Sequence, residues 1–445
     1  MENQELKKTI GFFPALSLVV GGVIGSGVFF KAATIAKTSQ SQSMFMLVWV
    51  LGGILSVCAA LTGAEIAAAI PETGGMLRYI ERGYGKGAAF LLGWAQIVIY
   101  FPADVAALSI AFATQCINLF GLPVAYVVPI AMITAIVTAA LNFLGSKVGT
   151  VIQSGAFILK LIPLLGIIIA GLFHSGGATV SLFPVTVGHD LSFWPALGAG
   201  LIATIYAYNG WIYIGNVAGE MKNPAKHLPR AIVGGILLIM AIYVVINFVY
   251  LRFMPISQIA GNQAAVNQIA EKLLGSMGGK FVTIGIMISV YGVINSYTFT
   301  GMRQPYALAQ EALFPFSKTF AKLSKTGVPV NAGLLELALA LLMLALTSFS
   351  KDAFDMLTNM LIFVIWLFYT LVFIAVYILR KKEPELKRPY KVPLYPFVPA
   401  IAILGGLFII GMELINDPKL SLIGLGVTLI GLPLYFIIKP KKEAA

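Results

Sequence analysis

Charged residues are scarce in this chain: Asp, Glu, Lys and Arg together make up 11% of its 445 residues. In soluble globular domains about a quarter of the residues are charged, so this low content argues against a soluble domain of any size. Cysteine and histidine are also rare, with two and three residues respectively. So few ligands predict neither a disulfide framework nor a Cys/His metal site, and we expect no cofactor.

Apolar sequence fills the chain instead, with 59% hydrophobic residues. Runs of about 20 apolar residues, long enough to cross the hydrocarbon core as helices, recur along almost its whole length. We therefore predict an all-α membrane protein with twelve transmembrane helices. The predicted spans are 9–36, 44–69, 88–119, 124–142, 148–173, 193–219, 228–251, 278–309, 328–348, 353–379, 393–416 and 419–438. The first apolar run continues past Ala33 without a small-residue cleavage site, so we do not expect a cleavable signal peptide.

The formal net charge of +12 is explained by topology and does not require a nucleic-acid partner. With the N-terminus placed inside, 22 of the 30 Lys and Arg residues fall on the cytoplasmic side, as the positive-inside rule requires. Seven, including Lys31, are assigned to the outside, and Lys160 lies within a span. We predict a multi-pass protein of the cell inner membrane or plasma membrane, surrounded by the lipid bilayer, with both termini cytoplasmic.

The first span is interrupted by four glycines in the seven residues from Gly21 to Gly27. Each glycine weakens a helix by about 1 kcal/mol relative to alanine. Unwound backbone at membrane depth is tolerated only where it is buried in protein or lines a wet cavity. The sixth span has a second interruption, the sequence Tyr-Ala-Tyr-Asn-Gly-Trp at 206–211.

These two spans are the first of two consecutive sets of five helices. The sets cover residues 1–173 and 174–379, and helices 11 and 12 with the tail cover 380–445. Matched interruptions in two halves of a chain indicate the binding site of a transporter. Close packing between helices would explain one glycine-rich span equally well, but it would not explain the pair.

The chemistry of such a site follows from the ends of the broken helices. The outer half of the first span starts with free N–H groups and the inner half ends with free carbonyls. A zwitterionic amino acid fits between them, with its carboxylate on the amides near Ser26 and Gly27 and its ammonium on carbonyls such as that of Val23. Tyr206 and Asn209 add carbonyls from the second break. The complete predicted substrate site is Val23, Ile24, Gly25, Ser26, Gly27, Tyr206, Ala207, Asn209, Gly210 and Tyr243.

Several motifs carry a family resemblance that covers nearly the whole chain. They are Gly-Ser-Gly-Val-Phe at 25–29, Ala-Glu at 64–65, Ile-Pro-Glu-Thr-Gly-Gly at 70–75, Trp211, and Glu-Met-Lys-Asn-Pro at 220–224. The chain resembles the L-type amino acid transporter family of the amino acid–polyamine–organocation superfamily, and looks most similar to bacterial members that carry alanine, serine, cysteine or threonine.

This resemblance implies a five-plus-five inverted repeat, discontinuous helices 1 and 6, and alternating access. It also implies mostly sodium-independent exchange of small neutral L-amino acids, glycine included. Tyr206 stands where several relatives carry a gating phenylalanine. Animal members are tethered to a heavy-chain glycoprotein through a cysteine, but Cys116 lacks that motif context, so no such partner is expected.

Few charged residues fall at membrane depth. Lys160 lies about 18 Å from either end of its span, beyond the reach of a snorkelling side chain, so its ammonium must find carbonyls or a carboxylate inside the bundle. In sodium-coupled relatives of the fold, a sodium ion lies between span 1 carbonyls and span 8 hydroxyls. The resemblance therefore implies that Lys160 replaces that ion, bonded to the Gly21 region and Ser289; a structural salt bridge is the alternative.

Other polar residues in the spans leave alternatives open. Asp104 and Glu336 either relay protons or face a local water pocket, and Glu65 is expected to hold the 70–86 segment. The Tyr243 hydroxyl either reaches the substrate carboxylate or the span 1 loop, or is packing with one hydrogen bond.

Other classes of function fit the sequence less well. No Ser/His/Asp set and no H-E-x-x-H motif is present, so we do not expect an enzyme. A channel or a receptor-like sensor on the same fold is a further alternative. Among carriers, the alternative is a proton-coupled symporter of amino acids or polyamines. The predicted site contains no acid for a second ammonium, which argues against cationic substrates.

Overall fold

The computed structural model describes residues 10–72 and 74–438, except for the side chains of 146–158, 217, 219 and 220. Within these residues the secondary structure is helical, apart from one isolated bridge between Ile10 and Met221. The predicted cytoplasmic cations Lys7, Lys8, Lys439, Lys441 and Lys442, Thr73 of the family motif, and the side chains of Lys147 and Glu220 lie outside the described residues.

The helices follow the predicted spans closely. In chain order they are α1 (Phe12–Val23), α2 (Gly27–Ser39), α3 (Gln42–Ala69), α4 (Met76–Tyr84), α5 (Lys86–Ala95), η1 (Gln96–Tyr100), α6 (Phe101–Phe120), η2 (Val124–Tyr126), α7 (Val127–Phe143), α8 (Ser146–Phe173), α9 (Phe193–Ala207), η3 (Trp211–Glu220), α10 (Pro224–Phe253), α11 (Ile256–Ile259), α12 (Ala265–Gly301), α13 (Arg303–Gln310), α14 (Ser317–Phe320), α15 (Val330–Thr347), α16 (Ala353–Lys382), α17 (Phe397–Asn416) and α18 (Pro418–Ile438). Among the described residues, ten helical stretches are long and apolar enough to cross a membrane. The count of twelve spans and the inverted repeat stay predictions.

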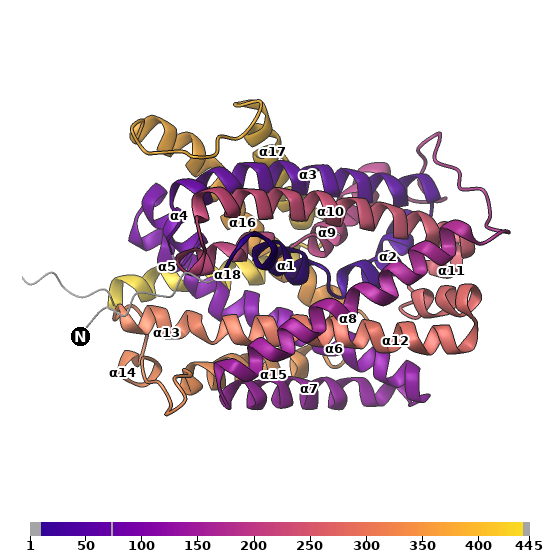
Figure 1. Ribbon diagram of the computed structural model, residues 1–445, viewed down its shortest axis with the longest axis horizontal. Helices are drawn as coiled ribbons and strands as arrows, with labels where there is room; N and C mark the ends of the chain where they lie inside the picture. Colours follow the sequence, from indigo (N-terminus) through magenta and orange to yellow (C-terminus); the bar gives the residue numbers. More distant parts are fainter. Residues whose placement is uncertain (1–9, 73, 439–445) are drawn as a thin grey trace, which may run out of the picture.

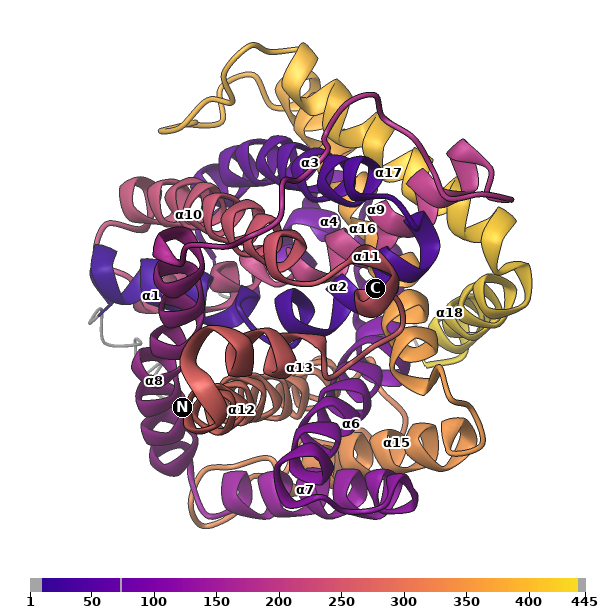
Figure 2. The ribbon, with the colours of Figure 1, turned by 90° about the vertical axis from the view of Figure 1, so that its right-hand side faces the viewer.

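Two of the predicted spans are broken at the expected places. The first divides into α1 and α2, separated by residues 24–26. The sixth divides into α9 and the 3-10 segment η3, separated by residues 208–210. Gly210 has φ 109°, a conformation that residues with a Cβ rarely adopt. Helices α2 and α9 pack together across these breaks (Figures 1 and 2).

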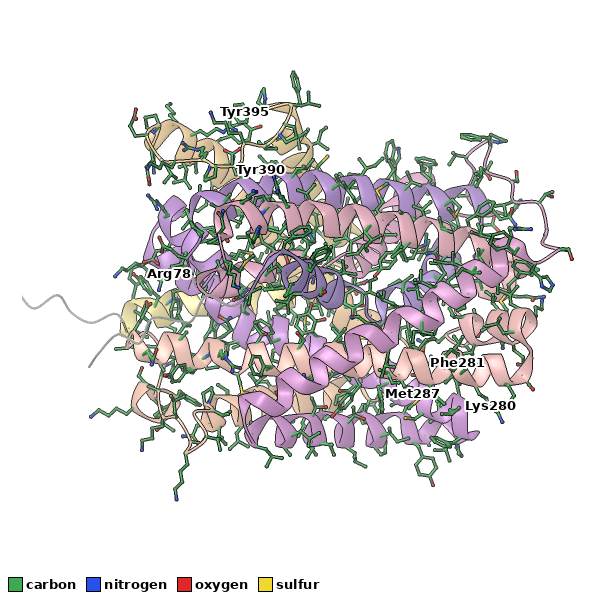
Figure 3. The ribbon with its side chains drawn as sticks, viewed as in Figure 1. Arg78, Lys280, Phe281, Met287, Tyr390 and Tyr395 are labelled. Atoms are coloured by element: carbon green, nitrogen blue, oxygen red, sulfur yellow. The ribbon has the colours of Figure 1, made fainter. Side chains whose placement is uncertain are left out.

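The other helices form two groups around the broken pair. Helix α10 packs against α3 and α1, while α12 packs against α8 and α6 and α15 packs against α7 and α6. Helices α17 and α18, in yellow tones, lie at the periphery (Figure 2). Arg78 and Lys280 lie toward opposite ends of the long axis (Figure 3); the orientation of the chain in the membrane stays a prediction.

Glu65 holds a different segment from the one that we expected. This buried acid accepts hydrogen bonds from Arg380 at 2.7 and 2.6 Å and from the backbone N–H of Val392 at 2.7 Å. It therefore joins the end of α3 to the 380–392 segment rather than to 70–86. Arg82 of α4 donates to Glu383 in the same segment, at 2.6 Å for the shorter contact. That hydrogen bond lowers the pKa of the Glu383 carboxyl, because it favours the charged form.

Candidate substrate site at the two helix breaks

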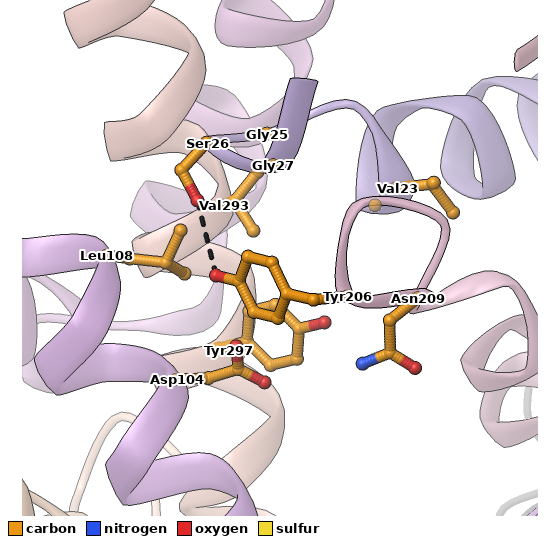
Figure 4. Close-up of a pocket in the computed structure, with 11 residues that line it drawn as sticks. Val23, Gly25, Ser26, Gly27, Asp104, Leu108, Tyr206, Asn209, Val293 and Tyr297 are labelled. Atoms are coloured by element: carbon orange, nitrogen blue, oxygen red, sulfur yellow. Dashed lines mark hydrogen bonds between the residues drawn. The ribbon is translucent and has the colours of Figure 1, made fainter. Parts of the chain in front are cut away.

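A small cavity lies between the two helix breaks (Figure 4). Its volume of about 20 Å³ has room for little more than one water molecule. The residues that line it come from α1 and the first break, α6, the second break and α12. They are Gly22, Val23, Gly25, Ser26, Gly27, Asp104, Leu108, Tyr206, Asn209, Val293 and Tyr297.

Backbone groups of opposite polarity face this cavity. Helix α1 ends at Val23, and its last carbonyls have no intrahelical donor. Helix α2 begins at Gly27, and the amides of Phe29 and Phe30 both donate to the Ser26 carbonyl, at 3.1 and 2.9 Å. The amides before Phe29 therefore form the free, partly positive end of α2.

Close contact with α9 holds the start of α2 in place. A Cβ added to Gly27 would lie 2.5 Å from the Ala207 Cα and 2.8 Å from its Cβ. Real Cβ atoms do not approach backbone atoms so closely, so only glycine fits at this position. Gly25 is less constrained, because an added Cβ would meet a side-chain methyl of Val293 at 3.1 Å.

Lys160 of α8 binds the carbonyls that the break exposes. Its ammonium donates to the carbonyl oxygen of Gly21 and, at 2.8 Å, to that of Ile24. The side chain is 2% exposed, so the cation is held by backbone dipoles inside the protein. Ser289 does not share it: this hydroxyl is fully buried on α12 but has no hydrogen-bond partner among the described residues. The expected bond from Lys160 to Ser289 is therefore not formed.

Tyr206 closes one side of the cavity. Its hydroxyl lies 3.2 Å from the Ser26 hydroxyl, within hydrogen-bond distance (Figure 4), and its ring packs edge-on against Phe354 of α16, with centroids 5.8 Å apart. Lys31 lies beside both rings, with its ammonium 5.1 Å from the Tyr206 centroid and 4.9 Å from the Phe354 centroid. Phe354 also lines a larger cavity of about 510 Å³, together with residues of α6, η2, α7, the segment before α12 and the α15–α16 connection.

Lys31, which we assigned to the outside, is not an exposed cation. It is fully buried on α2 and donates to Asp355 and Thr358 of α16, both at 2.6 Å. Thr34 also donates to the Asp355 carboxylate, at 3.0 Å. The ion pair therefore joins the outer half of the first span to α16, just beyond Tyr206.

The second break is held by a set of tyrosines. Asn209 donates to the Tyr100 hydroxyl at 2.7 Å, and Tyr369 donates to the Asn209 side-chain oxygen at 3.0 Å. The hydroxyls of Tyr100 and Tyr297 lie 3.3 Å apart, and the Tyr213 ring lies 5.4 Å from that of Tyr100. These contacts close the cavity on the side of η3.

Six of the predicted substrate-site residues line the cavity: Val23, Gly25, Ser26, Gly27, Tyr206 and Asn209. The other four surround it. Ile24 gives its carbonyl to Lys160, Ala207 packs against Gly27, Gly210 forms the turn of the second break, and Tyr243 donates to the Val23 carbonyl at 3.3 Å. Tyr243 thus contacts the span 1 loop, the second of the roles that we considered.

Sequence reasoning missed five lining residues: Gly22, Asp104, Leu108, Val293 and Tyr297. Asp104 had the clearest signal, because it is an acid in an apolar span, yet we placed no acid in the site. Its presence removes our argument against substrates with a second ammonium.

Glu336, the other acid that we considered as a relay, is not in the cavity. It packs against Gly301, and neither of its carboxyl oxygens has a hydrogen-bond partner in the described part of the chain. No group of three His, Cys, Asp or Glu side chains in the described chain could hold a metal ion.

Comparison with known proteins decides the family. The amino acid permease family model matches residues 10–437. The chain belongs to the amino acid permease family. It is 38% identical to the serine/threonine exchanger SteT of Bacillus subtilis, over all of this chain and 99% of that protein. It is also 31% identical to the human cystine/glutamate transporter, over 99% of this chain and 87% of the relative. The mouse large neutral amino acids transporter small subunit 2 is 30% identical, over 97% of this chain and 81% of the relative.

These matches confirm the resemblance to the L-type branch of the amino acid–polyamine–organocation superfamily. This permease is a multi-pass membrane protein that transports amino acids, not an enzyme. Its relatives are exchangers and transporters of several amino acid classes, so the cavity at the two breaks is the candidate substrate site.

The ion pair between the fully buried Lys31 and Asp355, whose side chain is 24% exposed, leads to a stability prediction. Replacing Asp355 by Asn leaves a fully buried ammonium without its counter-charge, which we expect to lower the free energy of unfolding by about 3 kcal/mol. Thermal unfolding of the purified protein in detergent measures this. Replacing both residues, Lys31→Met with Asp355→Leu, should recover much of the loss. The exposed pair of Lys37 and Asp352, 3.3 Å apart, is the control, and Lys37→Met should change little. Equal effects of Asp355→Asn and Lys37→Met would contradict the prediction.

Proposed function

We propose that this permease exchanges small neutral L-amino acids across the cell membrane by alternating access, without a coupling sodium ion. The expected substrates are alanine, serine, cysteine, threonine and glycine. The observation that carries the proposal is a small cavity at which the carbonyl end of α1 and the amide end of α2 face one another. Opposite partial charges at one cavity suit a zwitterion.

The hydrogen bonds around the break indicate which backbone groups are left for the substrate. The Gly21 and Ile24 carbonyls bind Lys160, and the Val23 carbonyl accepts from Tyr243. The Gly22 carbonyl, which belongs to a residue that lines the cavity, is then the main acceptor for the substrate ammonium. The carboxylate binds the first amides of α2, beside Ser26 and Gly27.

Cavity size and the relatives support a small substrate. About 20 Å³ of free volume and the apolar walls of Leu108 and Val293 leave little room for a long side chain unless Tyr206 moves. One relative is named a serine/threonine exchanger. Others are named for cystine and glutamate or for large neutral amino acids, so the side-chain end of the site varies within the family.

Lys160 supports the absence of sodium coupling. Its ammonium already binds two carbonyls of the broken first span, and carbonyl oxygens at such a break are the groups that would bind a coupling cation. A covalently attached cation stays in place throughout the transport cycle. It therefore stabilises the break without a sodium gradient.

Alternating access requires a barrier on each side of the substrate. We assign one barrier to Tyr206 with Ser26 and the Lys31–Asp355 pair, and the other to Asn209 with its tyrosine partners. The five-plus-five inverted repeat and the cytoplasmic location of both termini belong to this proposal. No heavy-chain glycoprotein is required by it.

A second candidate is a proton-coupled amino acid symporter, and one observation favours it. Asp104 places a carboxyl group that can take up a proton in the wall of the cavity. Counterflow separates the two mechanisms: an exchanger releases preloaded label only when unlabelled amino acid is outside, whereas a symporter also accumulates label down a pH gradient.

The proposed site also predicts which competitors bind. Because backbone dipoles hold both the α-ammonium and the α-carboxylate, a ligand that lacks either group should bind poorly. We expect L-alanine and L-serine to inhibit uptake of labelled alanine into proteoliposomes, and ethylamine and putrescine to leave it unchanged, in sodium and in choline medium alike. Strong competition by putrescine would contradict the site, and a requirement for sodium would contradict the role given to Lys160.

A further inference from the structure

Asp104 is the one acidic residue among those that line the cavity. Its side chain is 2% exposed, and its Oδ2 has no hydrogen-bond partner in the part of the chain that the structure describes. A buried carboxyl oxygen without a donor is costly. The free oxygen therefore calls for a partner that enters the cavity.

The helical geometry just before Asp104 sets the direction of its side chain. A five-residue π-helical turn, Gln96–Tyr100, interrupts the span immediately before α6. An extra residue in one turn rotates the rest of the helix by about 100°, and such turns often occur at functional sites. The rotation brings Asp104 and Leu108, one turn apart, into the same wall of the cavity.

Asp104 lies away from the protein groups assigned to the α-ammonium and α-carboxylate of the substrate. Figure 4 shows it beside Tyr297, separated from Ser26 by the Tyr206 ring. If the ammonium and carboxylate of an amino acid bind the α1–α2 break, its side chain points toward α6 and α12. Asp104 is the acidic acceptor on that wall, which also carries Tyr297 and the apolar side chains of Leu108 and Val293.

We propose that Asp104 selects substrates by their side chain: its free oxygen accepts a hydrogen bond from a donor on the γ atom, as in serine and threonine. This inference rests on the proposed function, and it adds that the preferred substrates are the hydroxyl-bearing members of the small neutral class. An apolar isostere would bury the same carboxyl oxygen without a donor, and sites that bind a hydroxyl in this way discriminate strongly against the analogue that lacks it.

The test compares serine with L-2-aminobutyrate, which has a methyl group in place of the hydroxyl. Each competes against labelled alanine in exchange by wild-type proteoliposomes. We expect the half-inhibitory concentration of serine to be about 10- to 100-fold lower, the factor given by one hydrogen bond to a carboxylate. L-2,3-Diaminopropionate, which carries a γ-ammonium, shows whether the donor must be neutral.

Variants assign the preference to Asp104. In Asp104→Leu, which has a similar shape but no acceptor, the serine-to-aminobutyrate ratio should fall to about one. Asp104→Asn keeps one acceptor oxygen and should retain part of it. The matched control is Ser109→Ala on the same helix, whose buried hydroxyl has no hydrogen-bond partner among the described residues and does not line the cavity; its ratio should equal the wild-type ratio.

The outcomes separate this inference from the function on which it rests. Absence of alanine exchange by the wild-type protein would overturn the proposed function itself. Exchange with no preference for serine, or a serine-to-aminobutyrate ratio in Asp104→Asn equal to the wild-type ratio, would overturn the role of Asp104 alone. Loss of pH-driven alanine uptake in Asp104→Asn with an unchanged serine ratio would assign Asp104 to proton transfer and also overturn it. Because the wild-type ratio and the Asn variant are decisive, the test does not depend on the Leu variant folding.

Discussion

Replacing Gly27 by valine is expected to abolish amino acid exchange while the protein still inserts into the membrane. The Cβ alone would overlap the backbone of Ala207, and the branched side chain would also crowd the amides proposed to bind the carboxylate. Separation of α2 from α9 should lower the free energy of unfolding by about 1–3 kcal/mol, as overpacking usually does. The exchange rate should be nearly lost although the protein stays folded, because the amides that bind the substrate are themselves displaced.

Membrane insertion, thermal unfolding and counterflow of labelled alanine should be measured on the same preparations. Gly27→Ala should show the same defect in weaker form. The matched control is Gly234→Ala on α10, where an added Cβ meets no atom within 4 Å; it should exchange alanine at the wild-type rate. Near wild-type exchange by Gly27→Val would show that the α1–α2 break is not the substrate site.

Replacing Lys160 by alanine should slow turnover severely and affect substrate affinity less. The ammonium binds the Gly21 and Ile24 carbonyls, so its removal leaves two buried acceptors unpaired, at a cost of several kcal/mol if nothing replaces it. The substrate is assigned to other groups, the Gly22 carbonyl and the α2 amides. The maximal rate should therefore fall more than the apparent affinity.

Exchange measured over a concentration series, in sodium and in choline medium, tests this expectation. Partial recovery of Lys160→Ala in sodium would indicate that a free cation can take the place of the ammonium. Lys280→Ala, an exposed cation on α12, is the control and should behave as wild type. A maximal rate unchanged by Lys160→Ala in both media would contradict the proposed role and remove the argument for sodium independence.

Some features of this site could be predicted because they are local. The four glycines between Gly21 and Gly27 weaken one helix wherever it packs, and the break is found within residues 24–26. The need of Lys160 for carbonyl partners also follows from its depth in a span alone, since a lone cation in the membrane is too costly. The choice of Gly21 as a partner rested on the family resemblance, and the hydrogen bond confirms it.

Other features depend on which face of a helix meets which neighbour. In lipid, both the outward and the inward faces of a helix are largely apolar, so periodicity does not indicate the face that lines a cavity. The sequence therefore could not assign Asp104 to the site. It also could not show whether the Ser289 hydroxyl binds Lys160 or, as the structure has it, has no partner among the described residues. The burial of Lys31 could not be predicted, because its partner, Asp355, lies 324 residues away in the sequence.

The sequence by itself determined that this chain is an α-helical membrane protein, where two of its helices break, and which family it belongs to. These properties depend on composition, on backbone propensity and on contiguous motifs. Only the tertiary structure decided that Asp104 of α6 lines the cavity, that Lys31 pairs with α16, and that Gly27 packs against Ala207. Such contacts join residues far apart in the chain, and their energies arise only when the helices have packed and excluded lipid and water from between them.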